Sequence, residues 1–377
     1  MKLTLQIKLL PTYEQVEILK DTFGVFNEAC NVISQIAWKR CVFKQFDLHK
    51  EVYCLIKETY HLSSQLVVHA ISKVANAYKS YRNKKRYFRK LGSITYDRRV
   101  LSYKISKSIC SISLIKGREK IAYICYRPHL MQFAKGEADL VFIRGKFYIY
   151  QTIEIPDERE NDVDDFIGVD MGITDIVSIS DGTNISSNEV KNIRDKYNKV
   201  RASIQSKGTR NCHKLLKRLR GREGGFATIV NHSISKWLVA KAKKENKGIA
   251  IEDLKNIRFG MNSKKRNKTF RRRSNSWSFY QLRSFLEYKC KMNGVKIIAV
   301  PPAYTSQTCH ECKHIGIRNG KRFHCKYCGN IADADINAAM NIATWGYVNT
   351  HERWELLSCS IHDDVSTSKT HKSLVYG

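Results

Sequence analysis

Two pairs of cysteines near the end of the 377-residue chain constrain its fold most strongly. Cys309 and Cys312 form one Cys-x-x-Cys pair, Cys325 and Cys328 form a second, and twelve residues separate the pairs. At this spacing, four thiolates can surround a Zn²⁺ ion tetrahedrally at about 2.3 Å. Four thiolates fill the coordination shell, so we predict one structural zinc ion that folds a module too small for a core of its own.

The composition narrows the class of protein. With 42% hydrophobic and 10% aromatic residues, the chain can bury a core, and its length allows two or three domains. No apolar run reaches the roughly 18 residues of a membrane span, so no membrane partner is expected. The first residues lack a secretory signal, so export is not expected and the twelve cysteines should stay reduced.

The formal net charge of +31 is concentrated in three segments, Tyr78–Lys90, Lys191–Arg222 and Lys255–Arg273. Together they carry +27 of it, because they hold 28 basic residues and one acidic residue. Basic side chains at this density repel one another unless a phosphate backbone neutralises them. A solvated basic surface is the alternative reading. We favour nucleic-acid contact, which would supply affinity without reading base sequence.

Each basic segment contributes candidate contacts. The segment 264–273 is too polar to pack and is interpreted as a loop facing nucleic acid, whereas Trp277 and Phe279 are interpreted as the start of a packed helix. The segment Tyr78–Lys90 has two interpretations that we weight equally, a helix that faces nucleic acid and a solvated surface. The candidates are Lys84, Lys85, Arg86, Lys217, Arg218, Arg220, Lys264, Lys265, Arg266, Arg271, Arg272 and Arg273.

The first 155 residues combine a strand, a helical part and a β-rich part. Apolar residues alternate over Leu3–Leu9, which predicts a half-buried strand. Thr12 and Gln15 then have the spacing of a capping box, and apolar residues follow at helical intervals. Helical patterning continues to about Lys90, and short β-rich pieces follow up to Ile155. We expect a helical unit inserted into, or preceding, a β-unit that includes the first strand.

A different pattern begins after an acidic linker at 156–165. Strands are predicted at 166–170, 175–180, 248–253 and 295–300, and helices over 189–246, over 279–292 and from residue 335. This order is typical of a mixed α/β sheet. The tail from Gly346 is expected to be loosely ordered.

Three acidic residues lie where distant segments can converge. Asp170 and Glu252 end predicted strands, and Asp335 begins the last helix. Three converging carboxylates need cations; Mg²⁺ or Mn²⁺ suits oxygen ligands, and a pair of ions supports phosphodiester hydrolysis. Taken singly, each acid reads more simply as a turn or cap residue. Neighbouring acids are alternatives: Asp175, Asp253 and Asp333.

The motifs together resemble the TnpB family, the transposon-encoded RNA-guided DNA endonucleases related to type V CRISPR effectors and Fanzor proteins. The resemblance is carried by IGVDMGI, IAIEDL and DADINAAMNIA, with the cysteine pairs between the last two. The stretches PAYTSQTC, NHSISKWLVAKA and WSFYQLRSFLEYKC are also similar to the family, as is the N-terminal KLLPTYEQ. One departure is Lys313-His314-Ile315 after the first pair, where the family commonly has glycine.

The resemblance implies an α/β, RNase H-like (RuvC) nuclease domain over 161–305 and 333–345, with an inserted zinc ribbon at 306–332. It also implies a wedge β-barrel formed by 1–12 plus 91–160, a helical recognition insertion at 13–90, and a flexible tail at 346–377. Asp170, Glu252 and Asp335 would be the metal-binding catalytic triad. Asp335 is chosen over Asp333 because the family's acid lies two positions before the asparagine that is here Asn337.

The function implied is RNA-guided cleavage of DNA by two Mg²⁺ or Mn²⁺ ions, in association with a transposable element. The implied partners are a guide RNA and a target DNA, with a monomer bound to RNA favoured. The location would be the nucleoid-containing cytoplasm in a prokaryote and the nucleus in a eukaryote. The alternatives are an RNA-guided regulator that binds DNA or controls transposition without cleavage, and an unguided resolvase of branched DNA.

Overall fold

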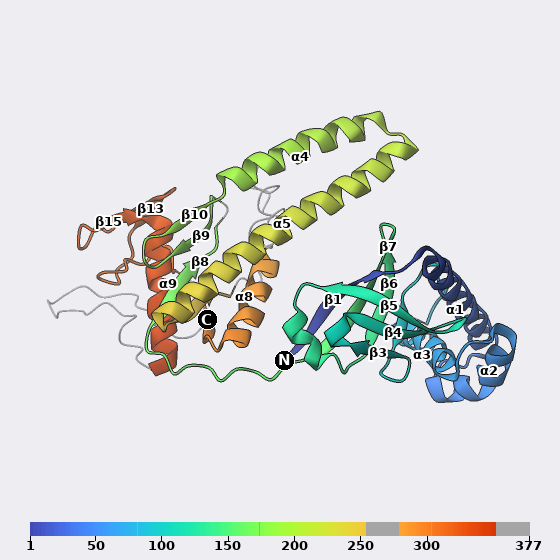
Figure 1. The fold of residues 1–377 in the computed structure, drawn as a ribbon. Coiled ribbons are helices and arrows are strands. Elements are labelled where there is room, and N and C mark those ends of the chain that lie inside the picture. Colours follow the sequence, from blue (N-terminus) through green and yellow to red (C-terminus); the bar gives the residue numbers. More distant parts are fainter. Residues whose placement is uncertain (81, 173, 254–278, 303, 352–377) are drawn as a thin grey trace. The chain divides into compact units, whose positions relative to one another are not determined.

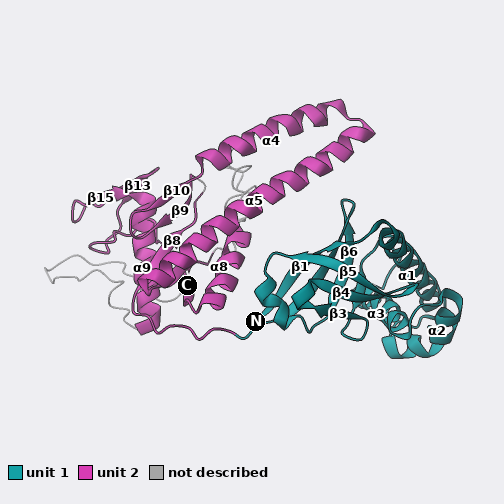
Figure 2. Ribbon diagram, in the orientation of Figure 1, with its two compact units in different colours: residues 1–156 teal, residues 157–377 magenta. Residues whose placement is uncertain are grey.

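The computed structural model describes residues 1–80, 82–172, 174–253, 279–302 and 304–351. The chain divides into two compact units, one ending at Pro156 and the other beginning at Asp157 (Figure 2). Within the described ranges, no helix has the length and apolar character needed to cross a membrane.

The first unit is built on an antiparallel sheet of seven strands in the order β2-β6-β7-β1-β5-β4-β3 (Figure 1). The N-terminal strand, predicted at Leu3–Leu9, is confirmed in the middle of this sheet, where it pairs with β5 and β7. Alternation places Leu5, Ile7 and Leu9 in the core. The strands are β1 (Lys2–Leu10), β2 (Ile94–Tyr96), β3 (Leu101–Lys104), β4 (Ile109–Leu114), β5 (Gly117–Cys125), β6 (Ala138–Ile143) and β7 (Lys146–Glu154), with 3-10 turns at Ile105–Lys107 and Pro128–Phe133.

Three helices lie between β1 and β2 along the chain: α1 (Tyr13–Arg40), α2 (Gln45–Tyr60) and α3 (Ser64–Ser80). The predicted capping box is confirmed, because Thr12 Oγ1 accepts from the Gln15 amide at 3.3 Å and Gln15 Oε1 accepts from the Thr12 amide at 3.1 Å. The apolar stripe of α1, which includes Phe23 and Phe26, is buried in one core with α2, α3 and the sheet.

The predicted helical pattern does not continue to Lys90, because α3 ends at Ser80 and residues 82–90 form no helix. Polar side chains of α1 hold the backbone of this segment instead. Asn31 Nδ2 donates to the carbonyl of Phe88 at 3.0 Å, and Ser34 Oγ donates to that of Arg86 at 2.7 Å. The interpretation of Tyr78–Lys90 as a helix that faces nucleic acid is therefore wrong for residues 82–90, which are not helical.

The second unit contains a mixed sheet of five strands in the order β10-β9-β8-β11-β12. β11 pairs in parallel with β8 and β12, whereas β9 runs antiparallel to β8 and β10. The predicted mixed α/β sheet is thus confirmed. Its strands are β8 (Phe166–Asp170), β9 (Asp175–Ile179), β10 (Asn184–Ser186), β11 (Gly248–Glu252) and β12 (Ile297–Val300).

Helices cover both faces of this sheet. Ile167 and Val169 face a core shared with α5 (Arg210–Glu245) and α8 (Phe279–Asn293), and Phe166 packs on the other face with Ile342 of α9 (Ala334–His351). α4 (Asn188–Lys207) pairs with the first half of α5 as a helical hairpin that extends away from the sheet (Figure 1). Three short strands, β13 (Ile317–Asn319), β14 (Arg322–His324) and β15 (Ile331–Asp333), form a small sheet before α9.

The last helix is longer than predicted, because α9 continues to His351. Gly346 lies against the sheet, and a Cβ there would come within 2.8 Å of Phe166 Cγ and 2.9 Å of Ala250 Cβ. The prediction of a loose tail from Gly346 is therefore wrong through His351. The remainder of that tail, 352–377, lies outside the described residues.

Candidate metal centres

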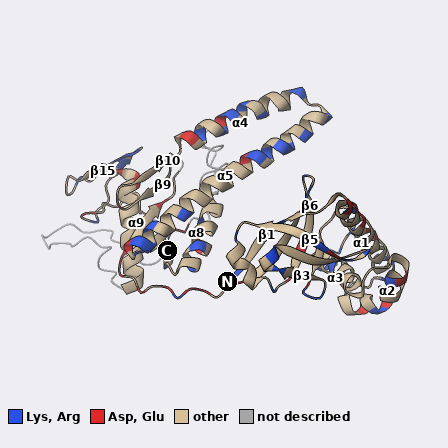
Figure 3. Ribbon diagram, viewed as in Figure 1, with Lys and Arg blue, Asp and Glu red and all other residues tan. Residues whose placement is uncertain are grey.

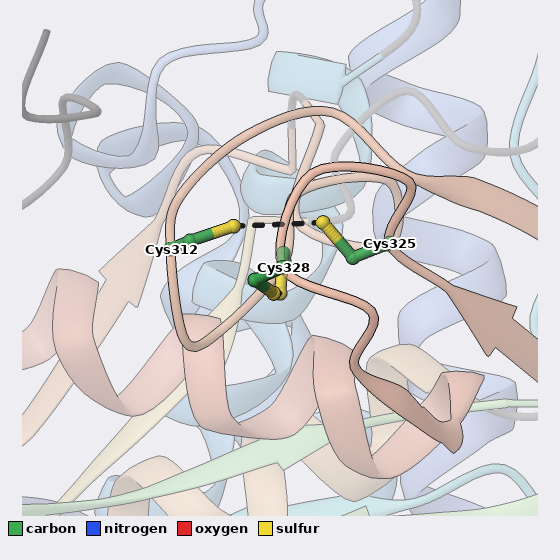
Figure 4. Close-up of side chains that lie close together, drawn as sticks. Cys312, Cys325 and Cys328 are labelled. Carbon is green, nitrogen blue, oxygen red and sulfur yellow. Dashed lines mark hydrogen bonds between the residues drawn. The ribbon is translucent and has the colours of Figure 1, made fainter.

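The four predicted zinc ligands come together around the small sheet β13–β15. All four Sγ atoms lie within 4.8 Å of one another (Figure 4 labels three of the cysteines). Cys309 Sγ is 3.7 Å from Cys328 Sγ, and Cys312 Sγ is 3.5 Å from Cys325 Sγ. A tetrahedron of sulfurs about 2.3 Å from a zinc ion has edges of about 3.8 Å, whereas a disulfide would bring two sulfurs to about 2.05 Å. The cluster therefore fits one four-coordinate metal ion.

Each Cys-x-x-Cys pair forms a tight turn, a cysteine knuckle, and the two knuckles have the same backbone geometry. The residue after each second cysteine is left-handed, with φ of 62° at Lys313 and 75° at Gly329. The amides of these residues donate to the carbonyls of Cys309 and Cys325, each at 3.0 Å. Burial opposes ionisation of Cys309, but the amides of Cys312 and Glu311 and the side chain of Asn330 together lower its pKa to about 6, whereas burial raises the pKa of Cys312 to about 12. Ionised sulfur is the form that binds metal.

The three predicted carboxylates converge on one face of the five-stranded sheet. Asp170 ends β8 and Glu252 ends the parallel strand β11. The register that pairs Ile251 with Val169 places Glu252 beside Asp170, on the face that α9 covers. Asp335 lies in the first turn of α9 and is 7% exposed.

The electrostatics of Asp170 show that the three acids interact. Burial, followed by the negative charges of Glu252 and Asp335, raises the pKa of Asp170 to about 7. Burial also raises the pKa of Glu252, against a hydrogen bond from Thr305 and the positive charge of Arg318. A partly buried group of like charges is a donor set that oxygen-seeking divalent cations can neutralise.

The alternative acids have other partners. Asp333 caps α9, because its Oδ1 accepts from the amides of Asp335 at 2.9 Å and Ile336 at 3.2 Å. Asp175 is buried in an ion pair with Lys321, and Asp253 accepts from Arg283 at 2.5 Å. The residues that remain to face Asp170 are therefore Glu252 and Asp335.

Two residues at this site carried no recognisable signal in the sequence. Arg318 of β13 donates to Asp335 Oδ1 at 2.6 Å, and Thr305 donates to Glu252 Oε1. Arg318 is one of four Lys and Arg residues between the cysteine pairs, and Thr305 lies in the PAYTSQTC stretch, whose residue types do not by themselves indicate a contact with Glu252. Among the described residues, only the four cysteines bring three ligand atoms within 4.8 Å of one another, and the three carboxylates do not.

The predicted nucleic-acid contacts divide between exposed and undescribed positions. Lys217, Arg218 and Arg220 are exposed on α5, where Lys and Arg follow the hairpin of α4 and α5 (Figure 3). Lys84 and Lys85 are exposed and Arg86 is half-buried in the extended segment after α3. The other six lie outside the described residues, as does Trp277: Lys264, Lys265, Arg266, Arg271, Arg272 and Arg273.

Comparison with known proteins finds a domain family that covers the four cysteines and Asp335. A Cas12f1-like TNB domain model matches residues 279–342. A TnpB-like protein of Methanocaldococcus jannaschii is 37% identical over 164 residues, 42% of this chain and 58% of the relative. A CRISPR-associated endodeoxyribonuclease Cas12f1 of Sulfoacidibacillus thermotolerans is 33% identical over 221 residues, 53% of this chain and 50% of the relative. The chain thus spans 58% and 50% of the lengths of these two curated relatives.

Among solved structures, the chain is similar to Cas12f1 in a cryo-EM structure of the Cas12f1–sgRNA–target DNA complex. The two chains share 16% sequence identity with a TM-score of 0.40, over 91% of this chain and 99% of the other. The sequence relatives and the matched domain, rather than this structural similarity, confirm the resemblance drawn from the motifs.

Proposed function

The chain is a relative of the TnpB-like and Cas12f proteins, and on that premise we propose that it is an RNA-guided DNA endonuclease associated with a transposable element. The observation that carries this proposal is the meeting of Asp170, Glu252 and Asp335 from three separate elements on one sheet face. The curated relative named an endodeoxyribonuclease supports it.

In this proposal, Asp170, Glu252 and Asp335 would hold two Mg²⁺ or Mn²⁺ ions. When bound, such ions supply the positive charge that activates an attacking water and stabilises the leaving oxygen of the phosphodiester. The carboxylates would orient the ions, and Arg318, which donates to Asp335 Oδ1, lies beside the residues that would hold them. The sheet face and α9 leave Asp170 half-buried, which strengthens its electrostatic interactions.

The domain assignments follow the same premise. The five-stranded sheet with α9 would be the RNase H-like RuvC core at 161–305 and 333–345, and 306–332 the zinc ribbon. The seven-stranded sheet would be the wedge formed by 1–12 plus 91–160, with α1 to α3 as the recognition insertion at 13–90. The insertion of three helices between β1 and its sheet neighbours supports that division. Guide RNA and target DNA would lie along the basic segments.

The decisive experiment compares cleavage with binding. Protein carrying its copurified guide RNA is incubated with Mg²⁺ and matched DNA, alongside Asp170→Ala and the control Asp162→Ala, whose side chain is exposed in the linker. We expect Asp170→Ala to abolish cleavage and to retain DNA binding, and the control to cut normally. Cleavage by Asp170→Ala would disprove the site. A wild-type protein that binds matched DNA without cutting it would instead be a regulator.

A further inference from the structure

Glu252 is held by a buried hydroxyl that belongs to neither metal centre. Thr305 is 2% exposed in the loop that leads from β12 to the first cysteine knuckle. Its Oγ1 donates to Glu252 Oε1, and its other neighbour is the carbonyl of Pro302 at 3.3 Å. A hydroxyl has one proton, and the carboxylate is the stronger acceptor. Thr305 therefore restricts the rotation of the Glu252 carboxylate.

The backbone around Thr305 is itself fixed by α9. Asn341 is 4% exposed and uses both amide hydrogens here, donating to the carbonyl of Thr305 at 2.9 Å and to that of Thr308 at 2.7 Å. One turn earlier, the fully buried Asn337 donates to the same Thr308 carbonyl at 2.7 Å. These asparagines belong to the helix whose first turn carries Asp335, so one rigid element reaches two of the three carboxylates.

We propose that Thr305 is a positioning residue for Glu252, and that Asn341 couples it to helix α9, so that Glu252 and Asp335 are presented together to a divalent cation. This inference rests on the proposed metal site at Asp170, Glu252 and Asp335. The physical basis is that hydrogen bonds to a ligating carboxylate orient it before the metal arrives, and their loss typically lowers metal affinity or activity 10- to 100-fold.

The test uses two substitutions that separate the hydroxyl from the shape of the side chain. Thr305→Val keeps the volume and removes the donor, whereas Thr305→Ser keeps the donor. The full chain is first loaded with zinc to fill the cysteine cluster, and Mn²⁺ binding is then titrated by the electron paramagnetic resonance signal of free Mn²⁺. We expect Mn²⁺ affinity to fall about tenfold or more in Thr305→Val and to stay within twofold in Thr305→Ser.

A matched control and a second variant make the result decisive. Thr344→Val removes a hydroxyl that bonds within α9, to the carbonyl of Met340 at 3.1 Å, and should leave Mn²⁺ affinity unchanged. Asn341→Ala should also weaken Mn²⁺ binding, although the Asn341 side chain bonds the backbone of Thr305 and Thr308 and not Glu252. Zinc content and the thermal midpoint report folding of every variant. If Thr305→Val misfolds, the Asn341→Ala result alone decides, and unchanged affinity there refutes the coupling.

Failure of this inference is distinguishable from failure of the proposed function. Unaltered Mn²⁺ binding in folded Thr305→Val, together with its loss in Asp170→Ala, would overturn the role of Thr305 and leave the metal site standing. Unaltered Mn²⁺ binding in Asp170→Ala would refute the metal site itself, and the positioning role with it.

Discussion

At the scale of single residues, Lys313 occupies a backbone conformation that favours glycine. It occupies the left-handed position after the first cysteine pair, with φ of 62°, and Gly329 occupies the matching position after the second. A left-handed backbone costs a residue with a Cβ roughly 1–2 kcal/mol and costs glycine almost nothing. The Lys313 side chain offsets part of this cost, because its Nζ donates to the carbonyl of His310 at 2.6 Å.

The free-energy cost of the left-handed backbone at Lys313 can be measured by comparing two substitutions, both of which remove the hydrogen bond from Lys313 Nζ to the carbonyl of His310. Lys313→Gly should bind zinc about fivefold more tightly than Lys313→Ala, which corresponds to about 1 kcal/mol. The measurement is zinc competition with a chromogenic chelator, because metal binding and folding of such a module are one free energy. Equal zinc affinity of the two variants would show that the left-handed turn is not strained.

At the scale of elements, the approach of α9 to β8 determines where Asp335 lies relative to Asp170. Gly168 makes this approach possible. A Cβ at residue 168 would lie 1.9 Å from the carbonyl oxygen of Ala339 and 2.5 Å from the amide nitrogen of Ala343. Both are backbone atoms of α9, so no side-chain rotation can relieve the overlap.

Gly168→Ala should therefore push α9 away from the sheet and destabilise the second unit by about 3 kcal/mol, the upper end of the usual cost of overpacking. Thermal unfolding monitored by circular dichroism measures this. The control is Gly225→Ala in α5, where a Cβ would meet no atom within 4 Å and should stabilise the helix by about 0.5–1 kcal/mol. A Gly168→Ala protein as stable as the wild type would contradict the packing described here.

At the scale of the whole molecule, the exposed basic residues of α4 and α5 and the acidic site belong to different elements of the second unit. The three acids of the candidate site, of which Asp335 is buried, lie at the sheet face, and exposed basic residues follow α4 and α5 (Figure 3). Phosphate contacts release counterions, so each one that is lost reduces the dependence of affinity on salt.

Replacing the three exposed α5 residues by glutamine should weaken binding to the guide RNA and reduce the slope of log affinity against log salt by about 2–3. The replaced residues are Lys217, Arg218 and Arg220. Filter binding at several salt concentrations gives both quantities. The matched control replaces three exposed lysines outside the basic segments, Lys104, Lys107 and Lys116, and should keep the slope. An unchanged slope in the α5 variant would remove this surface from the RNA interface.

Much of the fold followed from local sequence patterns. Apolar alternation located β1, the strand endings located Asp170 and Glu252, and the cysteine spacing anticipated the cluster. These patterns work because each depends on residues a few positions apart. The segment 82–90 was mispredicted because its backbone hydrogen bonds go to side chains of α1, more than fifty residues earlier.

The sequence by itself determined which residue types were available: four thiolates at zinc spacing, three acids at element ends and a concentrated positive charge. Only the tertiary structure decided which of the acids share a site. In the structure, Asp333 caps α9, Asp335 accepts a hydrogen bond from Arg318, and Glu252 accepts one from Thr305. The reason is physical. A hydrogen bond between side chains 53 residues apart depends on the packing of whole elements, here α9 on a glycine in β8, and no local pattern encodes that distance.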